Sequence, residues 1–170
     1  DRGASWRLLT AKSTVINAIQ VHPQDSDKII LGTESQGILR SEDGGRTWQE
    51  SNTGFIHRQV SRVVPDPLNT GRILANISTG QKGLYSFDEK QGRWLAPEGG
   101  ISPEVQVFSI AFLPGNQGSL AGTSRGIYWR GATSKAWVQL EGLIQRRIVY
   151  DLLVDALHSV VLAGTDRGIY

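Results

Sequence analysis

Apolar residues occur in short runs rich in Val, Ile, Leu and aromatic residues, and each run ends at turn residues. Runs of this length, bounded by Gly, Pro, Asn and Asp, predict β-strands. The clearest of them cover residues 15–21, 60–65, 107–113 and 149–154. No window of the chain places apolar residues at helical spacing. The pattern therefore predicts an all-β protein.

The pattern also repeats along the chain. A Gly followed by two apolar residues recurs at nearly equal intervals, at Gly37, Gly83, Gly126 and Gly168. A period of about 43 residues, with four antiparallel strands in each, is typical of a β-propeller blade. We expect one β-propeller segment over residues 1–170, with about four blades that belong to a larger ring or to a half ring. The repeat units are 1–10 (partial), 11–53, 54–97, 98–141 and 142–170 (partial).

One turn carries a recognisable motif, Ser41-Glu42-Asp43-Gly44-Gly45-Arg46-Thr47-Trp48. The Asp43 carboxylate can accept hydrogen bonds from turn amides, and Gly45 suits a positive φ. Trp48 offers a large apolar surface beside the sheet. The motif, S-x-D-x-G-x-T-W, resembles the Asp box, also called the BNR repeat. Incomplete copies are marked by Asp1, Gly3 and Trp6, by Asp88 and Trp94, and by Trp137. We expect the residues of these incomplete copies to be structural, and likewise those of the full motif, Ser41, Asp43, Gly45, Thr47 and Trp48.

The Asp-box resemblance implies several functions. Sialidases share the box, but they also carry an Arg-Ile-Pro motif that does not occur here. Xyloglucan-cleaving propellers need two carboxylates, whereas the predicted inner strands offer only Asp151. Sortilin-type receptors and photosystem II assembly factors bind protein partners on a propeller face. The resemblance therefore favours a non-enzymatic protein-binding or assembly module outside the cytoplasm, secreted or periplasmic. The alternative is a fragment of a secreted glycoside hydrolase, xyloglucanase-like or sialidase-like, that acts on polysaccharide.

Composition narrows these choices. The 18 Lys and Arg residues nearly balance the 16 Asp and Glu residues, which argues against a nucleic-acid surface. The chain has no Cys, and its three His residues do not have metal-ligand spacing, so we expect neither a metal nor a cofactor. No apolar run is long enough to span a membrane. The expected partner is a protein or a glycan.

The candidate binding residues are mostly Arg. Loops between blades, and loops between second and third strands, share one propeller face. Arg side chains there can bind an acidic partner because the guanidinium group matches a carboxylate, although solvated loop charges are the simpler interpretation. Aligned inner strands add Tyr150 and Asp151 at the channel mouth, where an Arg–Asp structural pair is the alternative. The predicted partner-binding residues are Arg58, Arg62, Arg125, Arg146, Arg147, Tyr150, Asp151 and Arg167.

The ends of the chain suggest association. Counting strands gives three complete units and a fourth unit without its last strand, while residues 6–9 have the character of such a strand. An open half propeller would leave unpaired strand edges. We therefore expect an excerpt of a larger propeller, or a half that self-associates to complete one, rather than an isolated four-bladed ring.

Overall fold

The computed structural model describes residues 3–66, 71–80, 82–96, 99–134 and 136–170, and the structural statements below concern these residues. They form small antiparallel sheets with two short 3-10 turns, η1 (Pro114–Asn116) and η2 (Leu143–Arg146). The predicted all-β propeller architecture is confirmed: four sheets follow one another along the chain as four blades. Asp1 lies outside the described residues.

Each blade takes its strands in chain order from the inside outward. Blade 1 contains β1 (Ile16–His22), β2 (Asp25–Thr33), β3 (Ile38–Ser41) and β4 (Gln49–Glu50). Blade 2 contains β5 (Val60–Pro65), β6 (Ile73–Ile77), β7 (Gly83–Asp88) and β8 (Arg93–Leu95). Blade 3 contains β9 (Val107–Leu113), β10 (Gly118–Thr123), β11 (Gly126–Arg130) and β12 (Val138–Gln139). Blade 4 contains β13 (Val149–Asp155), β14 (Val160–Thr165) and β15 (Gly168–Ile169).

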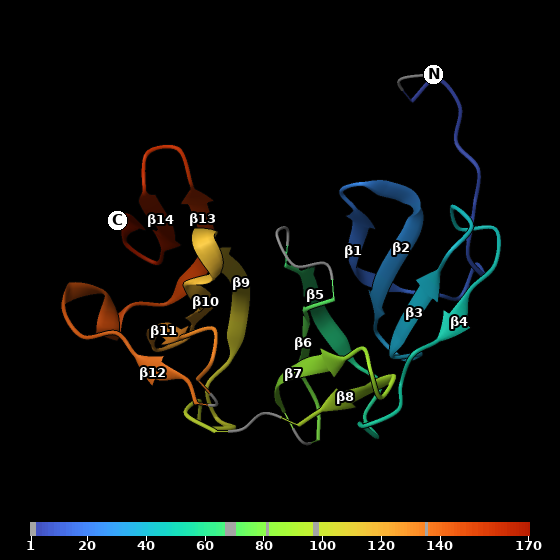
Figure 1. The fold of residues 1–170 in the computed structure, drawn as a ribbon. Helices are drawn as coiled ribbons and strands as arrows, with labels where there is room; N and C mark the ends of the chain where they lie inside the picture. Colours follow the sequence, from blue (N-terminus) through green and yellow to red (C-terminus); the bar gives the residue numbers. More distant parts are fainter. Residues whose placement is uncertain (1–2, 67–70, 81, 97–98, 135) are drawn as a thin grey trace.

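The blades follow one another along an open arc (Figure 1). β1 packs on β5, β5 on β9, and β9 on β13. No comparable packing joins β13 to β1 within the described part of the chain. Blade 4 and the N-terminal segment therefore lie at opposite ends of the arc.

The strand register shows which positions of the four blades correspond. Ile19, Val63, Ile110 and Leu152 each lie opposite the residue Leu31, Ala75, Ala121 or Ala163 of the neighbouring strand. We call residues that share such a place in the register matched positions. All four innermost strands also carry a register irregularity at the same place, at Asn17, Ser61, Phe108 and Tyr150. Each blade is thus a structural copy of the next.

The core consists of apolar layers between consecutive blades. Between blades 1 and 2, Ile38 packs with Val63 and with an aromatic group that contains Tyr85 and Trp94. Similar layers join blade 2 to blade 3 and blade 3 to blade 4. Since burial of apolar surface drives this packing, blades 2 and 3 are held on both faces, and blades 1 and 4 are held on the one face that has a neighbour among the described residues.

The turn between β3 and β4 is closed by side chains. The Asp43 carboxylate accepts hydrogen bonds from the Thr47 hydroxyl (2.6 Å), the Thr47 amide (2.9 Å) and the Ser41 hydroxyl (2.8 Å). The Ser41 hydroxyl in turn accepts the Gly45 amide at 2.8 Å, and Gly45 has a φ of 81°. These hydrogen bonds, first of all those from Thr47, lower the pKa of Asp43 to about 2.

The recurring Trp residues connect successive blades. The Trp94 indole donates to the Ser51 carbonyl at 2.8 Å, and the Trp48 indole donates to the Leu9 carbonyl at the same distance. Trp94 and Trp137 are buried, whereas Trp6 is exposed. The segment around Trp6 has strand-like sequence, but it forms no strand in the structure. It has no neighbouring sheet to pair with there, and an isolated strand leaves its backbone groups to water.

Candidate functional site

On the innermost strands, Phe108 contacts two of the predicted residues, Arg62 and Tyr150. The Arg62 Nε group donates to the Phe108 carbonyl at 2.9 Å, and the Phe108 ring lies 5.6 Å from the Tyr150 ring. Asp151 accepts the amide of the next residue, Leu152. Arg62 and Asp151 form no ion pair with each other or with any other described residue. Three consecutive blades therefore contribute Arg62, Phe108 and Tyr150 to one surface.

Ser61, Phe108 and Tyr150 occupy the irregular register positions of β5, β9 and β13. A residue at a bulge leaves the regular alternation of the strand, so its side chain is directed differently from its neighbours. Bulges are frequent next to functional sites for this reason. The same irregularity in consecutive blades aligns these side chains along the inner surface.

Two of the other predicted Arg residues are engaged in exposed ion pairs. Arg58 contacts Glu50 at 2.9 Å, and its hydrogen bond lowers the pKa of Glu50 below its ordinary value. Arg125 lies 3.9 Å from Glu104. These contacts reduce the free positive charge that the sequence suggested for this face.

The remaining predicted Arg residues lie at blade 4. Arg146 and Arg147 end the linker before β13, and Arg167 lies in the turn between β14 and β15. None of the three forms an ion pair with a residue that the structure describes. The predicted set is thus divided between the inner surface, two ion pairs and blade 4, and the structure shows no contact that unites it.

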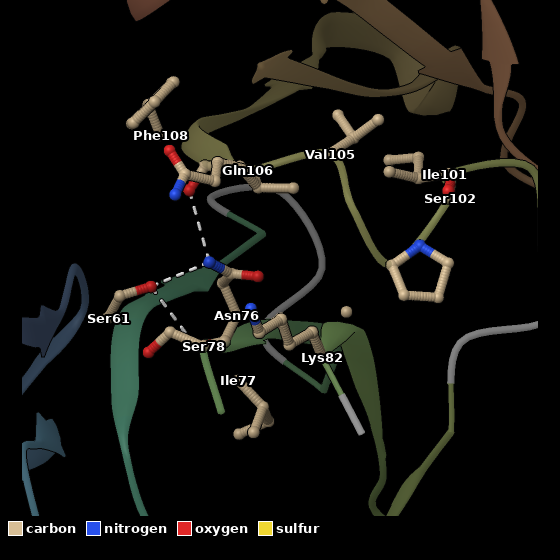
Figure 2. Close-up of a pocket in the computed structure, with 13 residues that line it drawn as sticks. Ser61, Asn76, Ile77, Ser78, Lys82, Ile101, Ser102, Val105, Gln106 and Phe108 are labelled. Atoms are coloured by element: carbon tan, nitrogen blue, oxygen red, sulfur yellow. Dashed lines mark hydrogen bonds between the residues drawn. The ribbon is translucent and has the colours of Figure 1, made fainter. Parts of the chain in front are cut away.

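A pocket lies between blades 2 and 3, with a volume of about 270 Å³ (Figure 2). Its polar lining includes Ser61, Asn76, Lys82 and Gln106, and its apolar lining includes Ile101 and Val105. Asn76 is 6% exposed and belongs to β6. Its Nδ2 group donates to the Ser61 hydroxyl at 2.7 Å and to the Val107 carbonyl at 3.2 Å. Asn76 therefore joins the two blades that form the pocket.

Asn76 interrupts the repeat. The matched positions in blades 1, 3 and 4 are Gly32, Gly122 and Gly164. A Cβ atom at Gly32 would lie 2.9 Å from the Val60 side chain, and one at Gly122 would lie 2.9 Å from the Val149 side chain. Blades 1 and 3 consequently need glycine to approach the next blade. In blade 2, an amide side chain bridges to the next blade instead.

The residue after Asn76 also differs. In the other blades it is Thr33, Thr123 or Thr165, and each hydroxyl bonds the carbonyl of the Gly that precedes or begins the third strand. Blade 2 has Ile77 there, which has no hydroxyl to make this bond. The loop from β6 to β7 is longer than its counterparts and contains Lys82. These differences place a cationic side chain at the pocket.

The pocket combines one charge with a free acceptor. Among the described residues that line the pocket, Lys82 is the only charged one, and it forms no ion pair with another described residue. Figure 2 shows Lys82 and the side-chain amide of Asn76 from neighbouring parts of blade 2. The Asn76 Oδ1 atom accepts no hydrogen bond from the described part of the chain. Lys82 can therefore bind an anionic group of a ligand. The Asn76 Oδ1 atom can accept a hydrogen bond from an N–H or O–H group of the same ligand, and Ile101 and Val105 can contact its apolar part.

A second, shallower hollow of about 370 Å³ adjoins the pocket and shares Ser61 and Phe108 with it. Arg62 and Glu34 also line this hollow. The Glu34 carboxylate accepts hydrogen bonds from Asn17 at 2.8 Å and from Gln59. The two hollows extend the candidate site from blade 3 across blade 2 to blade 1.

The described residues contain no group of three His, Cys, Asp or Glu side chains that could hold a metal ion. Among the helical segments that the structure describes, none has the length and apolar character needed to cross a bilayer. The site is thus characterised by Lys82, Arg62 and the polar groups around Asn76.

Sequence reasoning did not identify Asn76, Lys82 or Gln106 as site residues. A signal for Asn76 was present in the second strands: two blades read Leu-Ala-Gly-Thr, whereas blade 2 reads Leu-Ala-Asn-Ile. The departure from the repeat marks the blade that forms the pocket. The contact of Asn76 with the next blade depends on tertiary packing and could not be read from the sequence.

Comparison with known proteins supports the fold. The chain matches no protein-family model and no curated protein. It is similar to the extracellular domain of the one component system BT4673 from B. thetaiotaomicron, with a TM-score of 0.76 and 18% identity over 97% of this chain and 22% of that one. An ancestral GH74 enzyme gives a TM-score of 0.72 at 20% identity, over 97% of this chain and 24% of that one.

The chain therefore spans about a quarter or less of the length of these two proteins. The computationally designed protein Ika4 gives a TM-score of 0.68 at 14% identity, over 96% of this chain and 94% of that one. Identities this low establish similarity of fold alone. The comparisons and the four sheets together show that the chain is a β-propeller module.

Proposed function

We propose that this chain is a non-enzymatic binding module that recognises an acidic segment of a protein partner. The observation that carries the proposal is the pocket at Asn76, which forms where blade 2 departs from the repeat. Lys82 supplies a positive charge there, and Arg62 supplies another in the adjoining hollow. Both can bind carboxylates.

The size of the pocket favours a side chain as the bound group. About 270 Å³ is slightly below the range of pockets that enclose whole small-molecule ligands. Asp or Glu would place its carboxylate near Lys82 while its methylene groups contact Ile101 and Val105. We infer that a partner inserts one acidic side chain here, and that its neighbouring residues contact the hollow beside Arg62.

An extracytoplasmic location belongs to the same proposal. It is supported by the Asp-box resemblance and by the similarity to a domain described as extracellular. The outer part of the proposed binding surface consists of the other predicted residues, Arg58, Arg125, Arg146, Arg147 and Arg167. The exposed charges of Arg146 and Arg167, which form no ion pair with a described residue, would steer an acidic partner without fixing its position.

The experiment compares two labelled peptides, one of Glu and Ala and one of Gln and Ala, by fluorescence anisotropy. We expect the Glu peptide alone to bind, and binding to weaken as salt is added. Lys82→Gln and Arg62→Gln should each weaken it at least about fivefold. Lys90→Gln is the matched control, because Lys90 is exposed and lies outside both hollows. Equal binding of both peptides, or equal losses in all three variants, would contradict the proposal.

The glycoside hydrolase alternative is tested on the same preparation. Release of reducing ends from xyloglucan would support it against the binding module. The variant Asp151→Asn, at the inner-strand carboxylate, should then abolish the release.

A further inference from the structure

Asn76 carries a hydrogen-bond acceptor that the fold does not use. Both hydrogens of its Nδ2 group are engaged, one with the Ser61 hydroxyl and one with the Val107 carbonyl. The Oδ1 atom accepts no hydrogen bond within the described chain, and it is not among the fully buried polar atoms that lack a partner. The oxygen is therefore open to the pocket, which Asn76 lines.

The orientation of this amide is fixed by its partners. A main-chain carbonyl can only accept a hydrogen bond, so the Nδ2 group and not the oxygen must face Val107. A rotated amide would place two acceptors against each other. In Figure 2 the Oδ1 atom points away from Ser61, toward the space that Lys82 and Val105 border. The lining thus combines one fixed acceptor with the Lys82 ammonium group.

The acceptor is an addition to the repeat. At the matched positions of the other blades, Gly32, Gly122 and Gly164 have no side chain and offer no acceptor. Of the four matched positions, only the one at the pocket provides such a group. The acceptor and the pocket therefore occur at the same junction between blades.

A ligand in the pocket must bring a donor for this acceptor. The ligand displaces the water around Oδ1, and affinity is lost unless a ligand group replaces the hydrogen bond of that water. An ionised carboxylate has only acceptors, so the group that Lys82 binds cannot be the donor. A carboxylate alone would leave Oδ1 unsatisfied, at a cost in affinity. The donor must come from another part of the ligand.

The main-chain N–H is the donor that an acidic residue itself carries. Only a few bonds separate it from the side-chain carboxylate, so both groups fit in a pocket of about 270 Å³. The methylene groups between them can contact Ile101 and Val105, which form the apolar lining. One Glu or Asp residue thus supplies a partner for each kind of group in the lining.

We propose that Asn76 is a specificity-determining residue that accepts the main-chain N–H of the acidic residue bound at Lys82. The site then recognises an acidic residue as part of a peptide chain, and it discriminates against a carboxylate that has no neighbouring N–H. This inference rests on the proposed function, because it requires that Lys82 binds an acidic side chain. It adds the reason why the partner is a protein and not another polyanion.

Replacement of one peptide amide by an ester tests the inference on the unchanged protein. Unlabelled peptides with a single Glu and an amidated C-terminus compete with the labelled peptide of Glu and Ala, and fluorescence anisotropy measures their affinities. An ester that replaces the N–H of the Glu residue should weaken binding at least about fivefold. The same ester three residues away is the matched control and should change affinity less than about twofold. Equal affinities of the two ester peptides would overturn the inference.

The variant Asn76→Gly supplies the protein side of the test, because glycine is the residue at the matched positions. Circular dichroism and thermal melting establish whether it folds; if it does not, the ester comparison on the wild-type chain decides alone. The amide and ester peptides should bind this variant equally, since the acceptor is gone. Ser102→Ala, which changes another lining residue, and Lys82→Gln should both keep the difference. A difference that persists in Asn76→Gly would overturn the inference.

Failure of the inference can be told from failure of the proposed function. If the Glu peptide binds through Lys82 and the ester has no effect, the inference alone is wrong. If Glu and Gln peptides bind equally, both are wrong. A free C-terminus also places a carboxylate beside an N–H, so a peptide without Glu and with a free C-terminus is included. Equal binding of that peptide would overturn the assignment of the pocket to an acidic side chain.

Discussion

The Asn76 side chain donates a hydrogen bond to the Val107 carbonyl at 3.2 Å and so links β6 of blade 2 to β9 of blade 3. Blades 1 and 3 instead use Gly32 and Gly122, which let the next strand approach directly. One substitution in the repeat thus exchanges close packing for a polar bridge. The pocket of the proposed function lies at this bridge. It is therefore found at the blade in which Asn76 replaces the glycine of the repeat.

Asn76→Ala should destabilise the fold. The change removes two hydrogen bonds and leaves the Val107 carbonyl buried without that donor, which costs about 1–3 kcal/mol. The free energy of unfolding in urea measures the loss. Gln91→Ala is the control, because Gln91 is exposed and its change should stay within about 0.5 kcal/mol. Equal stability of both variants would show that the bridge is not structural.

Gly122→Ala should be destabilising where Gly164→Ala is not. A Cβ atom at Gly122 meets the Ser109 hydroxyl and lies 2.9 Å from the Val149 side chain, whereas one at Gly164 has no contact closer than 4.0 Å. Overpacking of this kind costs about 1–3 kcal/mol. Unfolding of the dilute, monomeric chain should show the loss at Gly122 alone.

Trp94→Phe should destabilise the contact between blades 1 and 2. Phe keeps an aromatic ring but has no N–H group, so the Ser51 carbonyl loses its donor at a cost of about 1–3 kcal/mol. Thermal unfolding of the dilute chain measures the effect. Trp6→Phe is the matched control, because the Trp6 side chain is exposed in the single chain. A similar loss in both variants would mean that the hydrogen bond is not the cause.

Asp43 should make stability depend on pH in acid. Its folded-state pKa of about 2 lies below the ordinary value of 3.8, so folding favours the carboxylate. Its contribution is therefore complete well above pH 3.8 and is lost as the pH falls toward 2. The difference in Tm between the wild-type chain and Asp43→Asn should shrink over this interval. A constant difference for Asp43→Asn would contradict the assignment.

The sequence predicted the strands closely where apolar runs end at turn residues. The innermost strands at 60–65 and 107–113 agree with β5 and β9, because their β-branched residues and following turns are local signals. The Arg residues were harder to interpret, since the pairing of Arg58 with Glu50 depends on which loops the fold brings together.

The amino-acid sequence by itself determined the all-β class and the turn at Asp43, because each depends on residues that are close together in the chain. It also determined the repeat, because the same local pattern recurs at a nearly constant interval. Tertiary structure alone decided the pocket and the exposed end faces. Asn76 and Val107 are far apart in the chain, and Ile169 differs from Ile127 in exposure although both follow the same local pattern. Burial and contact between blades depend on which blade lies beside another, and that relation is fixed by packing in space.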